Sequence, residues 1–137
     1  MFKNGNADLS LSASQVNIED MFSTYVYTGT GVAHDIVNGI DLAGEGGMVW
    51  TKYRGLVNSH SVYDTERGAT KRIYTDTTGG ENTVVGGGVV FNTDGFSLVT
   101  DENASGQDLV SWTFKKQPRF FDMVKYTGNG VAGREIA

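Results

Sequence analysis

The sequence contains no cysteine, a single proline and no long hydrophobic run. Without cysteine there is no disulfide, no thiolate nucleophile and no cysteine-bound zinc. No stretch approaches the roughly 20 apolar residues that cross a bilayer as a helix, so we expect no membrane insertion. Positive charge is also scarce, because 11 Lys and Arg face 16 Asp and Glu. Nucleic-acid binders need a cationic surface, and we therefore expect no nucleic-acid partner.

Glycine and aromatic residues, by contrast, are abundant. The 137 residues include 19 glycines, about twice the typical share of roughly 7%. Seven Phe, six Tyr and two Trp argue against a disordered chain. Tight turns between many short strands account for both features, which predicts an all-β domain. The length suits one domain that buries its own core.

Short runs of β-branched and aromatic residues recur along the chain, and each predicts a strand. The runs are Phe22–Tyr27, Met48–Tyr53, His60–Tyr63, Arg72–Thr75, Val89–Asn92, Phe96–Thr100, Leu109–Phe114 and Phe120–Tyr126. Asp94-Gly95 predicts a hairpin, because both residues tolerate positive φ. Only Val32–Val37 is a candidate for a turn of helix. Strands at this spacing favour an antiparallel β-sandwich of jelly-roll type, and we expect Trp50 and Trp112 in its core.

The first twenty residues differ from the rest. Leu9–Ser14 alternates apolar and polar residues, and Val16 and Ile18 continue the period of two. This pattern is typical of an extended strand with one apolar face. A lone strand is marginal, so the segment is expected to pair with a sheet or with another protein.

A repeat sets the expected domain boundaries. Tyr27–Ala33 recurs as Tyr126–Ala132, with six identities in seven positions at an offset of 99 residues. We therefore expect an N-terminal segment over residues 1–20, a β-sandwich module over 21–119, and the start of a second, truncated repeat over 120–137. Tandem modules are common where a protein must be long or multivalent, so the sequence is interpreted as the first part of a longer protein.

One acidic loop is the best candidate for a ligand or cation site. It contains Asp101, Glu102, Asn103 and Asp108, whose oxygen atoms are of the kind that calcium prefers. The loop lacks the spacing of an EF-hand, and a solvated acidic loop is the favoured interpretation. Calcium is the alternative, and no other cofactor is expected.

Other groups of residues are weaker candidates for a functional site. His34 and His60 have no metal-ligand spacing. Ser59–Ser61 with Asp64 supplies the residue types of a catalytic triad but no strand-to-helix turn to present the serine. The glycine-rich stretch 79–88 opens no helix and carries no Gly-Lys-Ser/Thr, so a mobile loop is favoured over a nucleotide site. Sixteen acidic residues make close carboxylate pairs inevitable, so a glycosidase pair cannot be inferred from sequence. We expect no enzymatic activity.

Several blocks, taken in order, resemble a family. They are Tyr63–Gly68, Asn92–Leu98, Ser111–Asp122 and Tyr126–Gly130, with Trp50 ahead of a Lys-x-Arg. In this order they resemble a module of tail fibre and other structural proteins of tailed bacteriophages, with a laminin-G-like or concanavalin-like fold. The resemblance covers the chain from about Phe22 onward. It implies a jelly-roll sandwich in a virion component, and it carries no catalytic residues.

The resemblance also gives the main functional hypothesis. Fibre proteins dock on the particle through their N-terminus, so the module is expected to link the tail or capsid exterior to distal host-binding modules, as a homotrimer. Leu9, Leu11, Val16 and Ile18 are then the candidate anchor to other virion proteins. The alternative is a lectin-like module that binds a host surface glycan through residues 76–88 and 101–107. A glycan-degrading enzyme is the third hypothesis.

Overall fold

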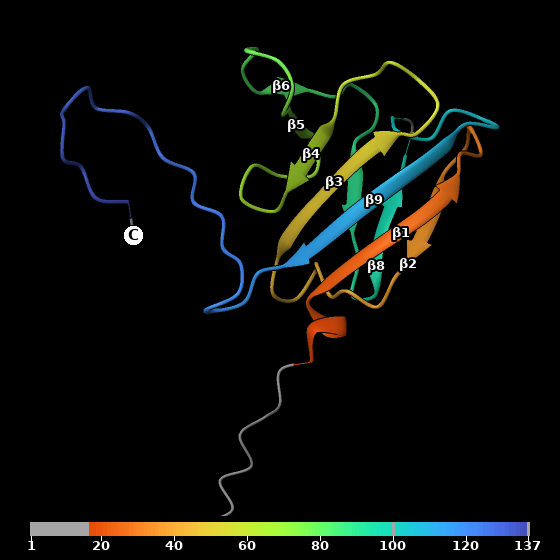
Figure 1. Cartoon of the computed structure of the whole chain (residues 1–137), viewed down its shortest axis with the longest axis horizontal. Coiled ribbons are helices and arrows are strands. Elements are labelled where there is room, and N and C mark those ends of the chain that lie inside the picture. Colours follow the sequence, from red (N-terminus) through yellow and green to blue (C-terminus); the bar gives the residue numbers. More distant parts are fainter. Residues whose placement is uncertain (1–16, 100, 137) are drawn as a thin grey trace, which may run out of the picture.

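The computed structural model describes residues 17–99 and 101–136. Within them the chain forms two antiparallel β-sheets and one short 3-10 helix (Figure 1). The elements are η1 (Ile18–Asp20), β1 (Phe22–Thr28), β2 (His34–Val37), β3 (Gly47–Tyr53), β4 (Ser61–Asp64), β5 (Lys71–Tyr74), β6 (Asn82–Thr83), β7 (Val89–Phe91), β8 (Gly95–Leu98) and β9 (Asp108–Lys115). No helix in these two ranges is long and apolar enough to span a membrane.

The strands form a sandwich of unequal sheets. The larger sheet has the order β1-β9-β3-β4-β5-β6 and the smaller has the order β2-β8-β7. Seven of the predicted strands are present to within two residues, and β7 and β8 pair as the predicted hairpin around Asp94-Gly95. The all-β sandwich is therefore confirmed. These strand orders do not show a jelly roll, which stays a prediction.

The core lies between the two sheets. Burial alternates along β3, where Val49 is completely buried, and Leu109 from β9 is equally buried. Ile36, Phe96 and Leu98 approach from the smaller sheet and are at most 1% exposed. Burying a large apolar side chain stabilises a fold by about 1.5–3 kcal/mol, so this cluster holds the sheets together.

Trp50 and Trp112 are not core residues, and that prediction is wrong. Val49 and Thr113, next to them in the sequence, point between the sheets, so both indoles lie on the opposite face of the large sheet. They are register partners, and their rings meet edge to face with centroids 5.5 Å apart. Alternation alone does not tell which face of a strand points inward.

Two other predictions differ from the structure. Val32–Val37 forms no helical turn, because it contains β2, which pairs with β8. Phe120–Tyr126 is not a strand, and its one ladder contact is the isolated bridge between Gln117 and Phe121. The strand just before it, β9, already has β1 on one side and β3 on the other, so this segment does not pair with β9.

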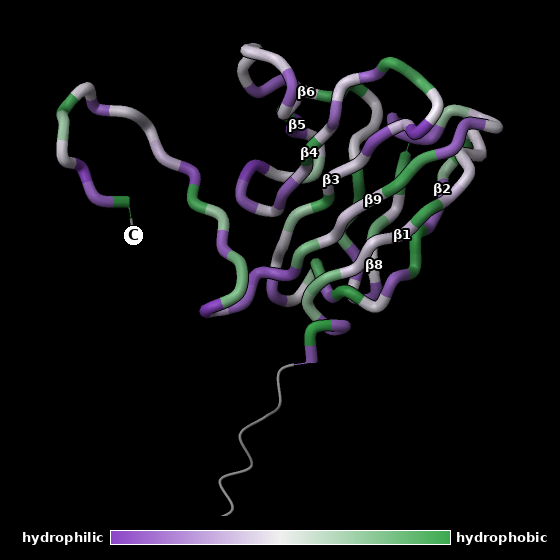
Figure 2. The backbone as a smooth tube through the Cα atoms, in the orientation of Figure 1, coloured by the Kyte–Doolittle hydropathy of each residue, from purple (hydrophilic) through white to green (hydrophobic). Residues whose placement is uncertain are grey.

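The segments before and after the sandwich leave from one end. Phe22 at the start of β1 pairs with Phe114 near the end of β9, and Figure 1 shows the segment after β9 running away from the sheets. Figure 2 shows hydrophobic stretches along this segment. Of the predicted anchor residues, Ile18 lies in η1 and is 53% exposed, whereas Leu9, Leu11 and Val16 fall outside the described residues.

Candidate functional site

The inner face of the large sheet carries a row of small, buried polar residues beside the candidate site. Thr51, Ser61, Ser111 and Thr113 are all 0% exposed. Thr51 lies opposite Ser61 on one side and Ser111 on the other, so small hydroxyl side chains line up across β4, β3 and β9. Large apolar residues would fill this part of the interior. Small ones leave room for a side chain from the loop before β9.

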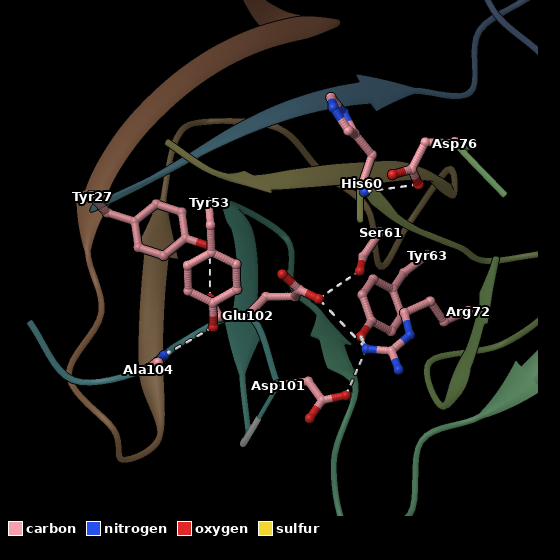
Figure 3. A network of polar contacts seen from close by, with 10 residues as sticks. All are labelled: Tyr27, Tyr53, His60, Ser61, Tyr63, Arg72, Asp76, Asp101, Glu102 and Ala104. Carbon is pink, nitrogen blue, oxygen red and sulfur yellow. Dashed lines mark hydrogen bonds and ion pairs between the residues drawn. The ribbon is translucent and has the colours of Figure 1, made fainter. Parts of the chain in front are cut away.

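Glu102 fills that room. Its side chain is 7% exposed, and its Oε1 accepts a hydrogen bond from Ser61 Oγ at 2.5 Å (Figure 3). Its backbone has φ +57, which is uncommon for a residue with a side chain. Burial raises the pKa of this carboxyl above its ordinary value, although the Ser61 hydrogen bond and the Arg72 charge oppose the shift.

The second oxygen of this carboxyl, Oε2, is buried and has no hydrogen-bond partner, and neither has Thr51 Oγ1. The Thr51 hydroxyl nevertheless lies near enough to the carboxyl to lower its pKa slightly. An unpaired buried oxygen is costly when charged, which is consistent with a carboxyl that resists ionisation.

Arg72 on β5 ties the carboxylates together. Its Nη1 lies 2.7 Å from Asp101 Oδ2 and 3.5 Å from Glu102 Oε1, and it donates to Tyr63 Oη at 3.4 Å. The guanidinium carbon lies 4.6 Å from the centroid of the Tyr74 ring. With carboxylates and an aromatic face around it, the guanidinium is held in one orientation. We call Ser61, Arg72, Asp101 and Glu102 the carboxylate–arginine cluster.

Tyrosines hold the loop of this cluster against the sheet. Tyr27 Oη donates to the backbone oxygen of Glu102 at 3.0 Å, and Tyr53 Oη accepts from the backbone N–H of Ala104 at 3.2 Å. Burial raises the pKa of Tyr27, Tyr53 and Tyr63 above the ordinary value for a phenol. All three therefore remain neutral hydrogen-bonding groups at physiological pH.

A cleft of about 500 Å³ lies beside the cluster. It is lined by Tyr53, Asn58, Ser59, Arg72, Tyr74, Asp101, Glu102 and Ala104. The lining therefore offers amide, hydroxyl, carboxylate and guanidinium groups next to tyrosine rings. Such a surface suits a small polar ligand with many hydroxyl groups, since each hydroxyl can both donate and accept.

The predicted ligand loop is only partly brought together. Asp101 and Glu102 join the cluster, but the buried Asn103 side chain points elsewhere, accepting from the Thr30 backbone N–H at 2.9 Å. Asp108 is exposed and accepts from Thr28 Oγ1 at 3.1 Å. Within residues 17–99 and 101–136, no three His, Cys, Asp or Glu side chains gather to hold a metal ion. The four side chains are therefore divided between the cluster and two other places in the fold.

The histidines and the triad residue types are also separated. Ser61 donates to Glu102, whereas His60 Nδ1 accepts from Trp50 Nε1 at 3.0 Å. His34 Nδ1 lies 3.3 Å from Asn103 Oδ1. Ser61 and His60 thus have different partners, as expected for structural residues. Ser61 was considered only as a triad residue type, and no local pattern in the sequence marks Arg72 or Tyr53 as a site residue.

Comparison with known proteins identifies a family without a known activity. A family model described as a domain of unknown function (DUF7483) matches residues 17–137. Because the match covers most of the chain, the chain belongs to this family. No curated protein and no solved structure matches it.

Proposed function

We propose that this member of the DUF7483 family is a non-enzymatic attachment module of a tailed-phage particle. It forms the particle-proximal part of a tail or head fibre, joins other virion proteins through its N-terminal segment, and links the particle to distal host-binding modules. The sequence blocks that resemble fibre proteins motivate this proposal. The structural observation that supports it is that β1 begins beside the end of β9.

Both flanking segments leave the sandwich at one end, because β1 begins where β9 ends. A domain held at one end keeps its remaining surface free, which suits a module that branches from a larger assembly. The segment after β9 also exposes Val124, Tyr126, Val131 and Ile136, each at least 43% accessible. Exposed apolar side chains of this kind favour association with another protein or with further copies of the chain, such as the expected homotrimer.

Particle incorporation tests the proposal. In one variant Leu9, Leu11 and Val16 are changed to Ser, and in the matched control Ser10, Ser12 and Ser14 are changed to Ala. We expect the first variant to fold with an unchanged melting temperature but to be missing from purified particles, as judged by immunogold electron microscopy. The control should be incorporated normally. If wild-type protein is missing from particles, or if both variants are incorporated equally, the attachment proposal is wrong.

The cleft supports a second candidate function, which is binding of a neutral host-surface glycan. The tyrosine rings and the polar groups of the lining match a ligand that presents both C–H faces and hydroxyls. Asp101 and Glu102 contribute to it, as do residues outside the loops expected from the sequence.

A glycan array with wild-type protein, followed by calorimetry on any hit, tests this second function. Asn58→Ala should weaken binding about fivefold, because the exposed Asn58 amide lines the cleft and one hydrogen bond to a ligand is worth about 1 kcal/mol. The control, Thr93→Ala, changes an exposed residue outside the lining and outside the loops expected from the sequence, and should bind normally. Absence of any bound glycan at millimolar concentration would eliminate this function.

A further inference from the structure

The segment that follows β9 repeats the turn that follows β1, although it forms no strand itself. Gly31 has φ +74 and its counterpart 99 residues later, Gly130, has φ +71. In the first turn the Val32 N–H donates to Thr30 Oγ1 at 3.4 Å, and in the second the Val131 N–H donates to Asn129 Oδ1 at 3.0 Å. The repeated sequence therefore adopts the same turn twice.

The two copies also meet the same aromatic ring. Phe22 begins β1 and its ring centroid lies 4.8 Å from that of Phe114. Phe121, at the matching position of the second copy, lies 5.1 Å from Phe114. Both repeats thus begin at the end of β9, one on the edge of the sheet and the other leading away from it.

Their environments differ beyond that point. Tyr27 is 9% exposed and its hydroxyl is bonded to the Glu102 backbone. Tyr126, its counterpart, is 59% exposed, and the Arg134 guanidinium carbon lies 5.6 Å from the centroid of its ring. The second tyrosine lacks the buried setting that the first one uses.

Gly128 in the second copy of the repeat suits the crowded position that Gly29 occupies in the first, although Gly128 itself lies in open space. At Gly29 a Cβ would lie 2.2 Å from the Ala104 backbone oxygen, so only glycine fits beside this loop. At the matching Gly128 a Cβ would meet nothing within 4 Å, and its φ is not positive. Glycine costs conformational entropy, and nothing around Gly128 offsets that cost. The residue suits a strand that passes close to a loop like that of Ala104.

We propose that Phe121–Ala132 is a second β1, and that it occupies the edge position beside β9 in a second copy of this chain. β1 lies at the edge of the large sheet, so replacing it leaves the inner strand pairings intact. The incoming segment supplies Phe121, Tyr126 and Gly128 where β1 supplies Phe22, Tyr27 and Gly29. Exchange of equivalent elements between copies is a low-cost route to assembly, and the head-to-tail form continues into a fibre.

The absence of native cysteine allows a direct test by cross-linking of the full chain. Thr28 is the register partner of Asp108 in the monomer, so in the exchanged form Thr127 of one copy takes that place beside Asp108 of the other. Chains carrying Asp108→Cys are mixed with chains carrying Thr127→Cys under mild oxidation and resolved by non-reducing electrophoresis. The reference pair combines Thr127→Cys with Thr93→Cys, an exposed position outside β1 and β9.

We expect the first pair to give a mixed dimer at least tenfold faster than the reference pair. Adding Gly128→Val to the Thr127→Cys chain should abolish that excess, because the valine side chain would collide with the loop at Ala104. The monomer tolerates this change, since the space around Gly128 is open. Equal rates for the two pairs, or an excess that survives Gly128→Val, would overturn the proposal, and the repeat would then pair with some other sandwich.

Discussion

The buried carboxyl of Glu102 should make the stability of the domain depend on pH in a definite direction. Its pKa in the folded state is raised above the ordinary value of 4.5, mainly by burial. The native state therefore favours the protonated form. The stability that this contributes is fully present below about pH 4.5 and is lost as the pH rises through the higher folded-state pKa.

Glu102→Gln isolates this effect. The amide keeps the shape of the side chain and an oxygen that accepts from Ser61 and Arg72, but it cannot ionise. The free energy of unfolding of the wild type, relative to this variant, should fall by about 1.4 kcal/mol for each unit by which the pKa is raised. Nearly all of the fall should occur between the unfolded-state and folded-state pKa values.

Urea denaturation at half-unit pH steps between pH 3.5 and 8, followed by the fluorescence of Trp50 and Trp112, measures this difference. Glu102→Ala is the companion variant. It leaves the Ser61 hydroxyl without its partner, so the free energy of unfolding should fall by about 1–3 kcal/mol at low pH. Arg72 is not left without a partner in this variant, because Asp101 Oδ2 still lies 2.7 Å from its Nη1. Two results would refute the argument that burial controls this carboxyl. One is a pair of wild-type and Glu102→Gln curves that run parallel across this range, and the other is a wild type that gains stability relative to Glu102→Gln as the pH rises.

Two further predictions concern how the loop and the core are held. Tyr27→Phe should cost about 1–3 kcal/mol in urea denaturation, because the buried backbone oxygen of Glu102 loses its donor. Tyr25→Phe is the control and should cost less than about 0.5 kcal/mol, because this side chain is 38% exposed. Leu109→Ala should cost about 2–5 kcal/mol, because Leu109 is completely buried between the sheets. Val90→Ala, at a site 48% exposed, should cost much less, and similar melting temperatures for these two variants would contradict the placement of the core.

The candidate site was only partly predictable from the sequence. The loop residues Asp101 and Glu102 stood out because several oxygen-bearing side chains occur close together there. Their partners did not, because Ser61 and Arg72 lie 41 and 30 residues before Glu102. Contacts over such separations depend on which strands become neighbours, and no local pattern records that.

What the sequence determined by itself is the local structure. Alternating runs and glycine-containing turns specify strands such as β3 and β9 and the hairpin at Asp94-Gly95, because these features depend on residues close together in the chain. Only the tertiary structure decided the rest. Trp50 and Trp112 became register partners on the outer face of the large sheet, and Phe120–Tyr126 formed no strand. The packing of the two sheets also buried Glu102. Which face of a strand points inward, and whether a charged group is buried, both depend on the elements that pack against it.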